Sequence, residues 1–354
     1  MNDKKYGIGI EYNKNNKIIY EGEFVNNKYD GRGTQYYKEG GKYKGHWENG
    51  EKNGKGEEYY KNNNKKYVGN FRNNHYSGKG FFFNENGNLE YDGNWENRKR
   101  NGKGIRYYNL EGEKKKYDGY FIHDVFHGNG TYYNKNQQVI YSGEWKNGRR
   151  NGKGRKYYEN KDNTIKYEGE FINGDYEGEG TLYYENGKKE YEGKWKNNKR
   201  CGKGKQYYDN INNILKYDDD FENNEYNGKG TSFYENGNKE YEGEWKNNKK
   251  CGIGKKYYKN EINNLEYYGG FLDDEFHGDG CSYYINGNEE YNGTRKNNKK
   301  EGPGVEYFNN KIIKSKGIYK NGKLYDGEGS EYENGKIKKY KLKNGEIVNE
   351  SCFK

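Results

Sequence analysis

Residues 167–187 read Y-E-G-E-F-I-N-G-D-Y-E-G-E-G-T-L-Y-Y-E-N-G. At the start of this stretch every second residue is aromatic or glycine, and the residues between them are charged. A period of two is typical of a strand with one buried face. Asn173-Gly174 then supplies the positive φ angles of a tight turn. The stretch therefore predicts one β-hairpin whose buried face carries rings and glycines.

The same arrangement follows in the next copy, and Asn186-Gly187 predicts the turn between the two. Glycine weakens an isolated strand, so its recurrence on one face predicts that rings lie flat across the backbone there. We expect Gly178→Val or Gly180→Val to clash with such a ring, and Glu179→Val to be nearly neutral. The residues that define these two hairpins are Tyr167, Gly169, Phe171, Gly178, Gly180, Tyr191, Gly193, Trp195, Gly202 and Gly204.

The hairpin pattern recurs through the whole chain. The motif Y-x-G-x-[F/W] is followed by G-x-G eleven residues after its tyrosine, and successive copies start 23 to 26 residues apart. Partial copies at Gly7/Gly9 and Gly327/Gly329 mark the two ends. A fixed short period predicts a repeat array, in which each unit buries its apolar face only against its neighbours. The copies start at Tyr20, Tyr43, Tyr67, Tyr91, Tyr117, Tyr141, Tyr167, Tyr191, Tyr217, Tyr241, Tyr267 and Tyr291.

A second period is twice as long, because the last aromatic of the motif alternates between Phe and Trp from Phe24 to Phe271. We call the two kinds Phe-type and Trp-type hairpins. Their regular alternation indicates that a pair of repeats was the duplicated unit. Arg295 stands where the next Trp should be, beside the single proline, Pro303, and we interpret this as decay at the terminal repeat.

The composition excludes two other classes of protein. The chain has 354 residues, only 29% of them apolar, and no alanine, so it cannot build the helices of a compact α/β enzyme. Its 44 tyrosines and five tryptophans argue against disorder. A net charge of +10 from 65 basic and 55 acidic residues is too balanced for an obligate nucleic-acid binder.

The cysteines and the termini predict an intracellular protein. Cys201, Cys251, Cys281 and Cys352 are too far apart for a disulfide framework or a structural zinc site, which favours reduced thiols. We interpret Cys201 and Cys251 as turn residues. The sequence shows no signal peptide, lipidation motif or transmembrane segment.

These repeats closely resemble the MORN-repeat family, and twelve copies in register carry the resemblance. It implies an all-β fold, an elongated antiparallel meander of tandem β-hairpins. We expect the array to occupy residues 1–335, with full repeats at about 20–314, and residues 336–354 to form a C-terminal cap or tail. Departures occur at Asp219, Arg295 and Ser315.

Nothing in the repeats predicts catalysis, a metal or a cofactor. The G-x-G pairs do not extend to a phosphate-binding loop, and fourteen of them in one chain favour a structural role. His123 and His127 would share a face on a helix but not in a strand and turn. Asp273-Asp274 and the carboxylates at 218–220 are typical of solvated turns.

Charge at the hairpin tips is the feature that most suggests an interaction. The Trp-type tips are basic, whereas Phe-type tips such as Asp273-Asp274 are neutral or acidic. Strand counting places an acidic tip about 20 Å from a basic one. Solvated turns explain any single tip, but their recurrence suggests an interaction surface. The candidate residues are Arg98, Lys99, Arg100, Arg149, Arg150, Lys199, Arg200, Lys249, Lys250, Lys299 and Lys300.

The resemblance implies a non-enzymatic scaffold in the cytoplasm, at the cytoskeleton or as a peripheral membrane protein. Because the tips alternate in charge, we favour a protein partner or a homodimer, which can match the alternation, over a membrane. The alternatives are a peripheral binder of acidic phospholipids or phosphoinositides through the basic tips, and a regulatory subunit of a separate kinase or methyltransferase.

Overall fold

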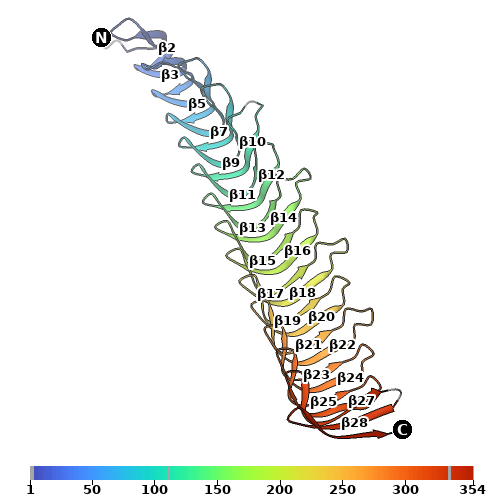
Figure 1. Ribbon diagram of the computed structural model, residues 1–354. Coiled ribbons are helices and arrows are strands. Elements are labelled where there is room, and N and C mark those ends of the chain that lie inside the picture. Colours follow the sequence, from blue (N-terminus) through green and yellow to red (C-terminus); the bar gives the residue numbers. More distant parts are fainter. Residues whose placement is uncertain (1–3, 111, 334–335, 354) are drawn as a thin grey trace. The chain divides into compact units, whose positions relative to one another are not determined.

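The computed structural model describes residues 4–110, 112–333 and 336–353, and within them it contains 29 β-strands and no helix. The chain divides into two compact units, residues 1–175 and 176–354, which we call the first and second unit. In each unit every strand pairs antiparallel with the next strand of the chain, so the hairpins follow one another like ribs (Figure 1). The all-β meander of tandem hairpins is confirmed.

The strands of the first unit are β1 (Gly7–Tyr12), β2 (Ile18–Val25), β3 (Lys28–Tyr36), β4 (Lys42–Glu48), β5 (Glu51–Tyr59), β6 (Lys65–Arg72), β7 (His75–Phe83), β8 (Leu89–Glu96), β9 (Lys99–Tyr107), β10 (Lys115–Ile122), β11 (Val125–Tyr133), β12 (Val139–Lys146), β13 (Arg149–Tyr157) and β14 (Ile165–Ile172). Those of the second are β15 (Asp175–Tyr183), β16 (Lys189–Lys196), β17 (Lys199–Tyr207), β18 (Leu215–Glu222), β19 (Glu225–Phe233), β20 (Lys239–Lys246), β21 (Lys249–Tyr257), β22 (Leu265–Leu272), β23 (Glu275–Tyr283), β24 (Glu289–Lys296), β25 (Lys299–Tyr307), β26 (Ile313–Lys320), β27 (Lys323–Glu333), β28 (Lys336–Lys343) and β29 (Glu346–Phe353). The C-terminal segment thus forms a further hairpin, β28–β29.

Each hairpin turns at a two-residue tip and contains a register shift. In β16–β17 the tip is Asn197-Asn198, with φ angles of 49° and 63°. Asparagine tolerates this left-handed conformation better than most residues, which explains its frequency at the tips. Gly193 pairs with Gly204, and Trp195 pairs with Arg200, so the strand that returns from the tip has extra residues between those two pairs. This bulge decides which side chains of the returning strand face the rings.

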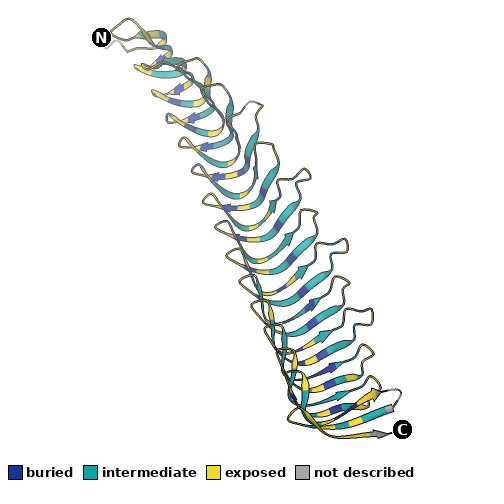
Figure 2. Ribbon diagram, viewed as in Figure 1, coloured by how far each residue is buried: buried dark blue, intermediate teal, exposed yellow. Residues whose placement is uncertain are grey.

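The core is a row of tyrosine rings on one face of the sheet. Tyr191 is fully buried, and its hydroxyl donates a hydrogen bond to the carbonyl oxygen of Lys194 at 3.1 Å. The ring passes over Gly204 of the next strand, where a Cβ would lie 2.3 Å from the tyrosine oxygen. The second glycine of G-x-G therefore makes room for the ring, as the sequence predicts. Buried segments recur along each unit in the same place on every hairpin (Figure 2).

The first glycine of G-x-G has a different role. Gly178 and Gly202 have φ angles of 62° and 56°, in the left-handed region that favours glycine. A Cβ on Gly202 would meet the flexible end of Lys194 at 3.4 Å, and no ring lies within 4 Å of it. The expected ring clash is therefore wrong for this slot, because the bulge turns the position away from the tyrosine.

The Phe/Trp alternation has a hydrogen-bonding cause. Each Trp side chain donates its indole N–H to a backbone carbonyl of the preceding Phe-type hairpin, as Trp245 does to Gly230 at 3.1 Å. Phenylalanine has no such donor, and Phe221 instead packs edge-on against Tyr191 of the Trp-type hairpin before it, with centroids 5.1 Å apart. The same indole bond occurs from Trp47 to Gly33, Trp95 to Gly80, Trp145 to Gly130 and Trp195 to Gly180.

Arg295 keeps the packing of the tryptophan that it replaces. Its side chain is 9% exposed, its guanidinium lies 4.9 Å from the centroid of Tyr291, and one nitrogen donates to Ser282 Oγ at 2.8 Å. In the following hairpin Ser315 replaces the first tyrosine, and its hydroxyl lies 2.6 Å from that of Tyr319. These substitutions keep a packed core, although Arg295 Nε is buried without a hydrogen-bond partner, and decay at the terminal repeat stays a prediction.

Candidate interaction surfaces

The structure separates the basic tip residues into two sets. Six side chains lie at the turn or on the first residue after it and are exposed: Arg98, Lys99, Arg149, Lys199, Lys249 and Lys299. The residue after these, on the returning strand, is only partly exposed in every case: Arg100, Arg150, Arg200, Lys250 and Lys300. Each basic pair, Lys-Arg, Arg-Arg or Lys-Lys, thus contains one solvated cation and one packed cation.

The packed cations lie over the core tyrosines. The guanidinium carbon of Arg200 is 5.1 Å from the ring centroid of Tyr191, and Lys300 Nζ is 5.1 Å from that of Tyr291. A cation above an aromatic face is attracted by the ring quadrupole. In Phe-type hairpins the position of the packed cation, which we call the slot, holds an aromatic ring. Tyr226 occupies it and stacks on Tyr217 with centroids 3.8 Å apart. The slot therefore closes the core in both kinds of hairpin.

Carboxylates of the chain also neutralise these cations. Lys250 lies 2.9 Å from Glu240, Arg200 pairs with Glu190, and Lys300 lies 2.8 Å from Glu306. Burial opposes ionisation of Glu306, but hydrogen bonds from Lys300 and Lys314 outweigh it and hold the pKa of Glu306 below its usual value. Cations held in this way are structural, and little of their charge is offered to a partner.

The tips of adjacent hairpins touch. Arg100 N donates to Asp124 Oδ1 at 3.0 Å, Asp124 N donates to the carbonyl oxygen of Arg100 at 3.0 Å, and the two side chains form an ion pair at 2.8 Å. Lys249 also reaches Asp273 at 3.5 Å. The expected separation of about 20 Å is wrong, because each turn leans back onto the preceding hairpin. Part of the charge alternation is thus matched within the chain.

The second tip residue links neighbouring hairpins, a structural role that the sequence pattern did not predict. Where it is Asn or Asp, its side-chain oxygen accepts the backbone N–H of the packed residue in the preceding hairpin. We call this contact the tip staple. The tip staples run from Lys52 to Asn74, Arg100 to Asp124, Tyr176 to Asn198, Arg200 to Asn224, Tyr226 to Asn248, Lys250 to Asp274 and Phe276 to Asn298. The available signal was the recurrence of Asn or Asp at this one position.

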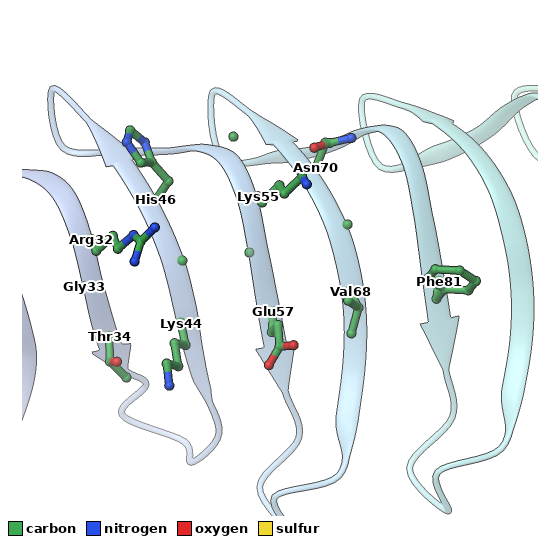
Figure 3. Close-up of a pocket in the computed structure, with 14 residues that line it drawn as sticks. Arg32, Gly33, Thr34, Lys44, His46, Lys55, Glu57, Val68, Asn70 and Phe81 are labelled. Carbon is green, nitrogen blue, oxygen red and sulfur yellow. The ribbon is translucent and has the colours of Figure 1, made fainter.

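The face opposite the tyrosines carries the residues that vary between repeats. In the first unit this face is hollowed into a pocket of about 1050 Å³ over β3 to β7 (Figure 3). Smaller hollows of about 490 and 410 Å³ lie on the same face in the second unit. We call this side of the sheet the variable face. It offers side chains of different chemistry on a constant aromatic framework.

The cysteines and histidines form no site in the part of the chain that the structure describes. Cys201 and Cys251 lie in β17 and β21, so our assignment of them to turns is wrong. Cys281 is buried, and burial raises the pKa of its thiol. The side chain of Cys352 lies outside the description. Among the described residues no group of three or more His, Cys, Asp or Glu could hold a metal ion.

The repeats match the model of the MORN repeat in twelve segments: residues 20–42, 43–65, 67–89, 91–109, 117–139, 141–163, 167–189, 191–210, 220–239, 241–261, 267–289 and 291–311. The chain belongs to the MORN-repeat family. The match has the repeat length and the register that the hairpins show. Membership identifies a repeat scaffold and leaves its partner open.

Other comparisons add little. No curated protein matches the chain in sequence. A solved structure that it resembles is a mutant Tc holotoxin pore of Photorhabdus luminescens, at 8% identity and a TM-score of 0.14. That alignment covers 96% of this chain and 16% of the toxin chain. Within the described residues no helix has the length and apolar character needed to span a membrane.

Proposed function

We propose that this MORN-repeat protein is a non-enzymatic scaffold that binds protein partners in the cytoplasm, at the cytoskeleton or at the cytoplasmic side of a membrane. The observation that supports the proposal is that the two faces of the sheet differ in burial and in sequence variation. The tyrosine face is nearly invariant and is buried, whereas the variable face is open and differs in chemistry from repeat to repeat. Side chains that vary on a rigid framework provide recognition without catalysis.

Binding of acidic phospholipid through the exposed tips is the second candidate. A polybasic surface gains about 1 kcal/mol for each Lys or Arg near an anionic membrane. Some of the tip cations are engaged within the chain, however, since Lys249 pairs with Asp273 and Arg98 donates to the carbonyl oxygen of Asn74 at 2.9 Å. This engagement favours a protein partner over a membrane for the exposed set.

The test compares two charge-reversal variants of the full chain. The tip variant carries Lys99→Glu, Lys199→Glu and Lys299→Glu. The face variant carries Lys44→Glu, Lys55→Glu and Lys203→Glu, which changes the same number of charges on exposed residues of the variable face. Each tagged protein is recovered from its native cell after crosslinking, and the captured proteins are quantified against the unchanged chain.

We expect the face variant to lose proteins that the tip variant retains. We also expect neither the unchanged chain nor the variants to float with vesicles of phosphatidylserine or phosphoinositide. Salt-sensitive flotation that only the tip variant loses would replace the protein-binding proposal with lipid binding. Identical capture by all three proteins would contradict a role for either surface.

A further inference from the structure

The pocket on the variable face of the first unit differs from the same place in other repeats. The second residue of Y-x-G-x-[F/W] is acidic in seven of the twelve copies: Glu21, Asp92, Asp118, Glu168, Glu192, Asp218 and Glu242. In two successive copies the position instead holds Lys44 and Val68, and both line the pocket. Ser142, Tyr268 and Asn292 also replace the acid, but Lys44 is the only cation at this position in the twelve copies, which distinguishes the pocket.

The departure changes which charges face one another across the strands. In other repeats the acidic residue faces a cation across the strands, as Glu168 faces Arg155 at 2.7 Å and Asp218 faces Lys205 at 3.9 Å. In the pocket the register places Lys44 opposite Thr34 on β3 and opposite Glu57 on β5, so the order of acid and cation is reversed there.

Three exposed cations, Arg32, Lys44 and Lys55, line the same hollow. None of them lies within 4.0 Å of a carboxylate in the described part of the chain. The single acid of the pocket, Glu57, is already bonded to Lys65 at 3.3 Å. With three cations and one carboxylate, the pocket lining therefore has an excess of positive charge.

An apolar wall lies beside these cations. Val68 pairs with Phe81 across β6 and β7, and the Phe81 side chain is 43% exposed. The corresponding slot holds a polar or charged residue in eight of the other eleven repeats, and Ile105, Cys281 and Val305 in the remaining three. Figure 3 shows Arg32 and Lys44 on neighbouring strands at one end of the pocket and Val68 and Phe81 toward the other. A ring with 43% of its surface exposed offers apolar area to a ligand.

We propose that this pocket binds an extended acidic segment of a partner protein, with its carboxylates on Arg32, Lys44 and Lys55 and an apolar side chain against Val68 and Phe81. The inference rests on the proposed scaffold function and names the chemistry of the partner. The volume of about 1050 Å³ is at the upper end of that of ligand pockets. A lipid headgroup alone would leave the apolar wall of Val68 and Phe81 unused, and we therefore favour an acidic segment that also carries an apolar side chain.

The experiment uses purified full-length protein and a short fluorescent peptide of alternating Glu and Leu, followed by anisotropy at low and physiological salt. Two further peptides replace all Glu by Lys or all Leu by Ser. The test variants are Lys44→Glu combined with Lys55→Glu, and Phe81→Ser. The matched control is Lys153→Glu, because Lys153 occupies the Lys55 slot in a later Trp-type hairpin of the same unit and is exposed.

We expect only the Glu/Leu peptide to bind tightly, and the double charge reversal to weaken it at least about tenfold, with Lys153→Glu close to the unchanged chain. Phe81→Ser should weaken it by a smaller factor and leave its salt dependence unchanged. Circular dichroism and a thermal melt confirm that each variant is folded.

Three outcomes would overturn the proposal: no binding of the Glu/Leu peptide, equal loss with Lys153→Glu, or binding of phosphatidylserine vesicles that the double reversal abolishes. The scaffold proposal is tested separately: it fails if the crosslinked partners of the full chain are unaffected by both surface variants, or if flotation is lost only by the tip variant.

Discussion

Two neighbouring hairpins of the second unit close the same core in different ways. In the Phe-type hairpin β18–β19, Tyr226 stacks on Tyr217 at 3.8 Å, and its hydroxyl donates to Gln206. In the Trp-type hairpin β20–β21, Lys250 takes this slot over Tyr241 at 5.5 Å and pairs with Glu240. The basic residue of the Trp-type hairpin thus takes the place of the aromatic ring of the Phe-type hairpin. A lysine beside a turn can be a core residue.

The largest effect that we expect is collective and appears in alkali. Burial raises the pKa of Tyr267 and of Tyr291 to about 12. Since an unfolded tyrosine titrates near pH 10, the stability that these phenols contribute is complete below about pH 10 and is lost as the pH rises through the folded value near 12. Many core tyrosines share this shift, so the array should unfold cooperatively in that window, as followed by circular dichroism.

The loss of stability in alkali should be larger for Phe-type hairpins with a tyrosine at the slot than for Trp-type hairpins. Burial also raises the pKa of Tyr226, whereas Lys250 brings no phenol to the same slot. Tyr226→Phe should therefore reduce the loss of stability between pH 7 and pH 11 relative to the unchanged chain, and Phe126 and Phe276 show that the slot accepts phenylalanine. An alkaline transition at the same pH as that of a free tyrosine would contradict the buried ring row.

Truncation of the slot residue to alanine should cause the next largest loss of stability. The loss should be larger in the Phe-type hairpin than in the Trp-type hairpin. Tyr226→Ala removes a stacked ring and should cost about 3 kcal/mol of stability. Lys250→Ala removes a cation over a ring and an ion pair, worth about 1 kcal/mol in total. Hydrogen exchange of peptides from β18 to β21 gives the local opening free energies. Equal losses would show that the slot is not part of the core in Phe-type hairpins.

The substitution Lys250→Tyr tests whether an aromatic ring can replace the cation at the slot of a Trp-type hairpin. The new ring should stack on Tyr241 as Tyr226 does on Tyr217, and the chain should retain its stability within about 1 kcal/mol. Glu240 keeps a hydrogen bond from Ser232 at 3.1 Å after Lys250 is lost. A loss as large as that of Tyr226→Ala would show that the slot is specific for the cation.

The glycine beneath the tyrosine should not distinguish the two kinds. A Cβ would lie 2.0 Å from the tyrosine oxygen at Gly230 and 2.3 Å from it at Gly254. Gly230→Val and Gly254→Val should each cost about 1–3 kcal/mol, as overpacking does. The control Lys229→Val, at an exposed neighbour of Gly230, should be nearly neutral. Stability is measured by urea unfolding. If only one of Gly230→Val and Gly254→Val lost stability, the two kinds of hairpin would not share the tyrosine–glycine packing.

The smallest effect separates the tip staple from tip charge. Asp274 accepts the backbone N–H of Lys250 at 2.9 Å, whereas Asp273 makes an exposed ion pair with Lys249. Asp274→Ala should cost about 1 kcal/mol, and Asp273→Ala less than about 0.5 kcal/mol. Asp274→Asn should restore the loss, because Asn224 makes the same bond in a sister hairpin. A salt-dependent loss that Asn does not restore would identify Asp274 as a charge partner instead.

The hairpins, their turns and the ring–glycine contact could be predicted because twelve copies repeat one pattern and local rules of strand and turn chemistry suffice. The role of Arg200 could not, because the bulge between the Gly193–Gly204 and Trp195–Arg200 pairs sets which way it faces. The contact between Arg100 and Asp124 depends on how far one turn leans onto its neighbour, which no local pattern encodes. The pocket was missed because it is defined by residues of five strands together.

The tip staple and the alternating slot have a consequence for how such an array can change in length. Loss of a single Phe-type repeat would set two Trp-type hairpins side by side, and the indole of the second would no longer follow a Phe-type hairpin with a carbonyl such as that of Gly230. It would also bring two basic turns into contact. Loss or gain of fifty residues, the spacing between Tyr191 and Tyr241, restores every neighbour. We therefore expect natural length variants of this array to differ by an even number of repeats.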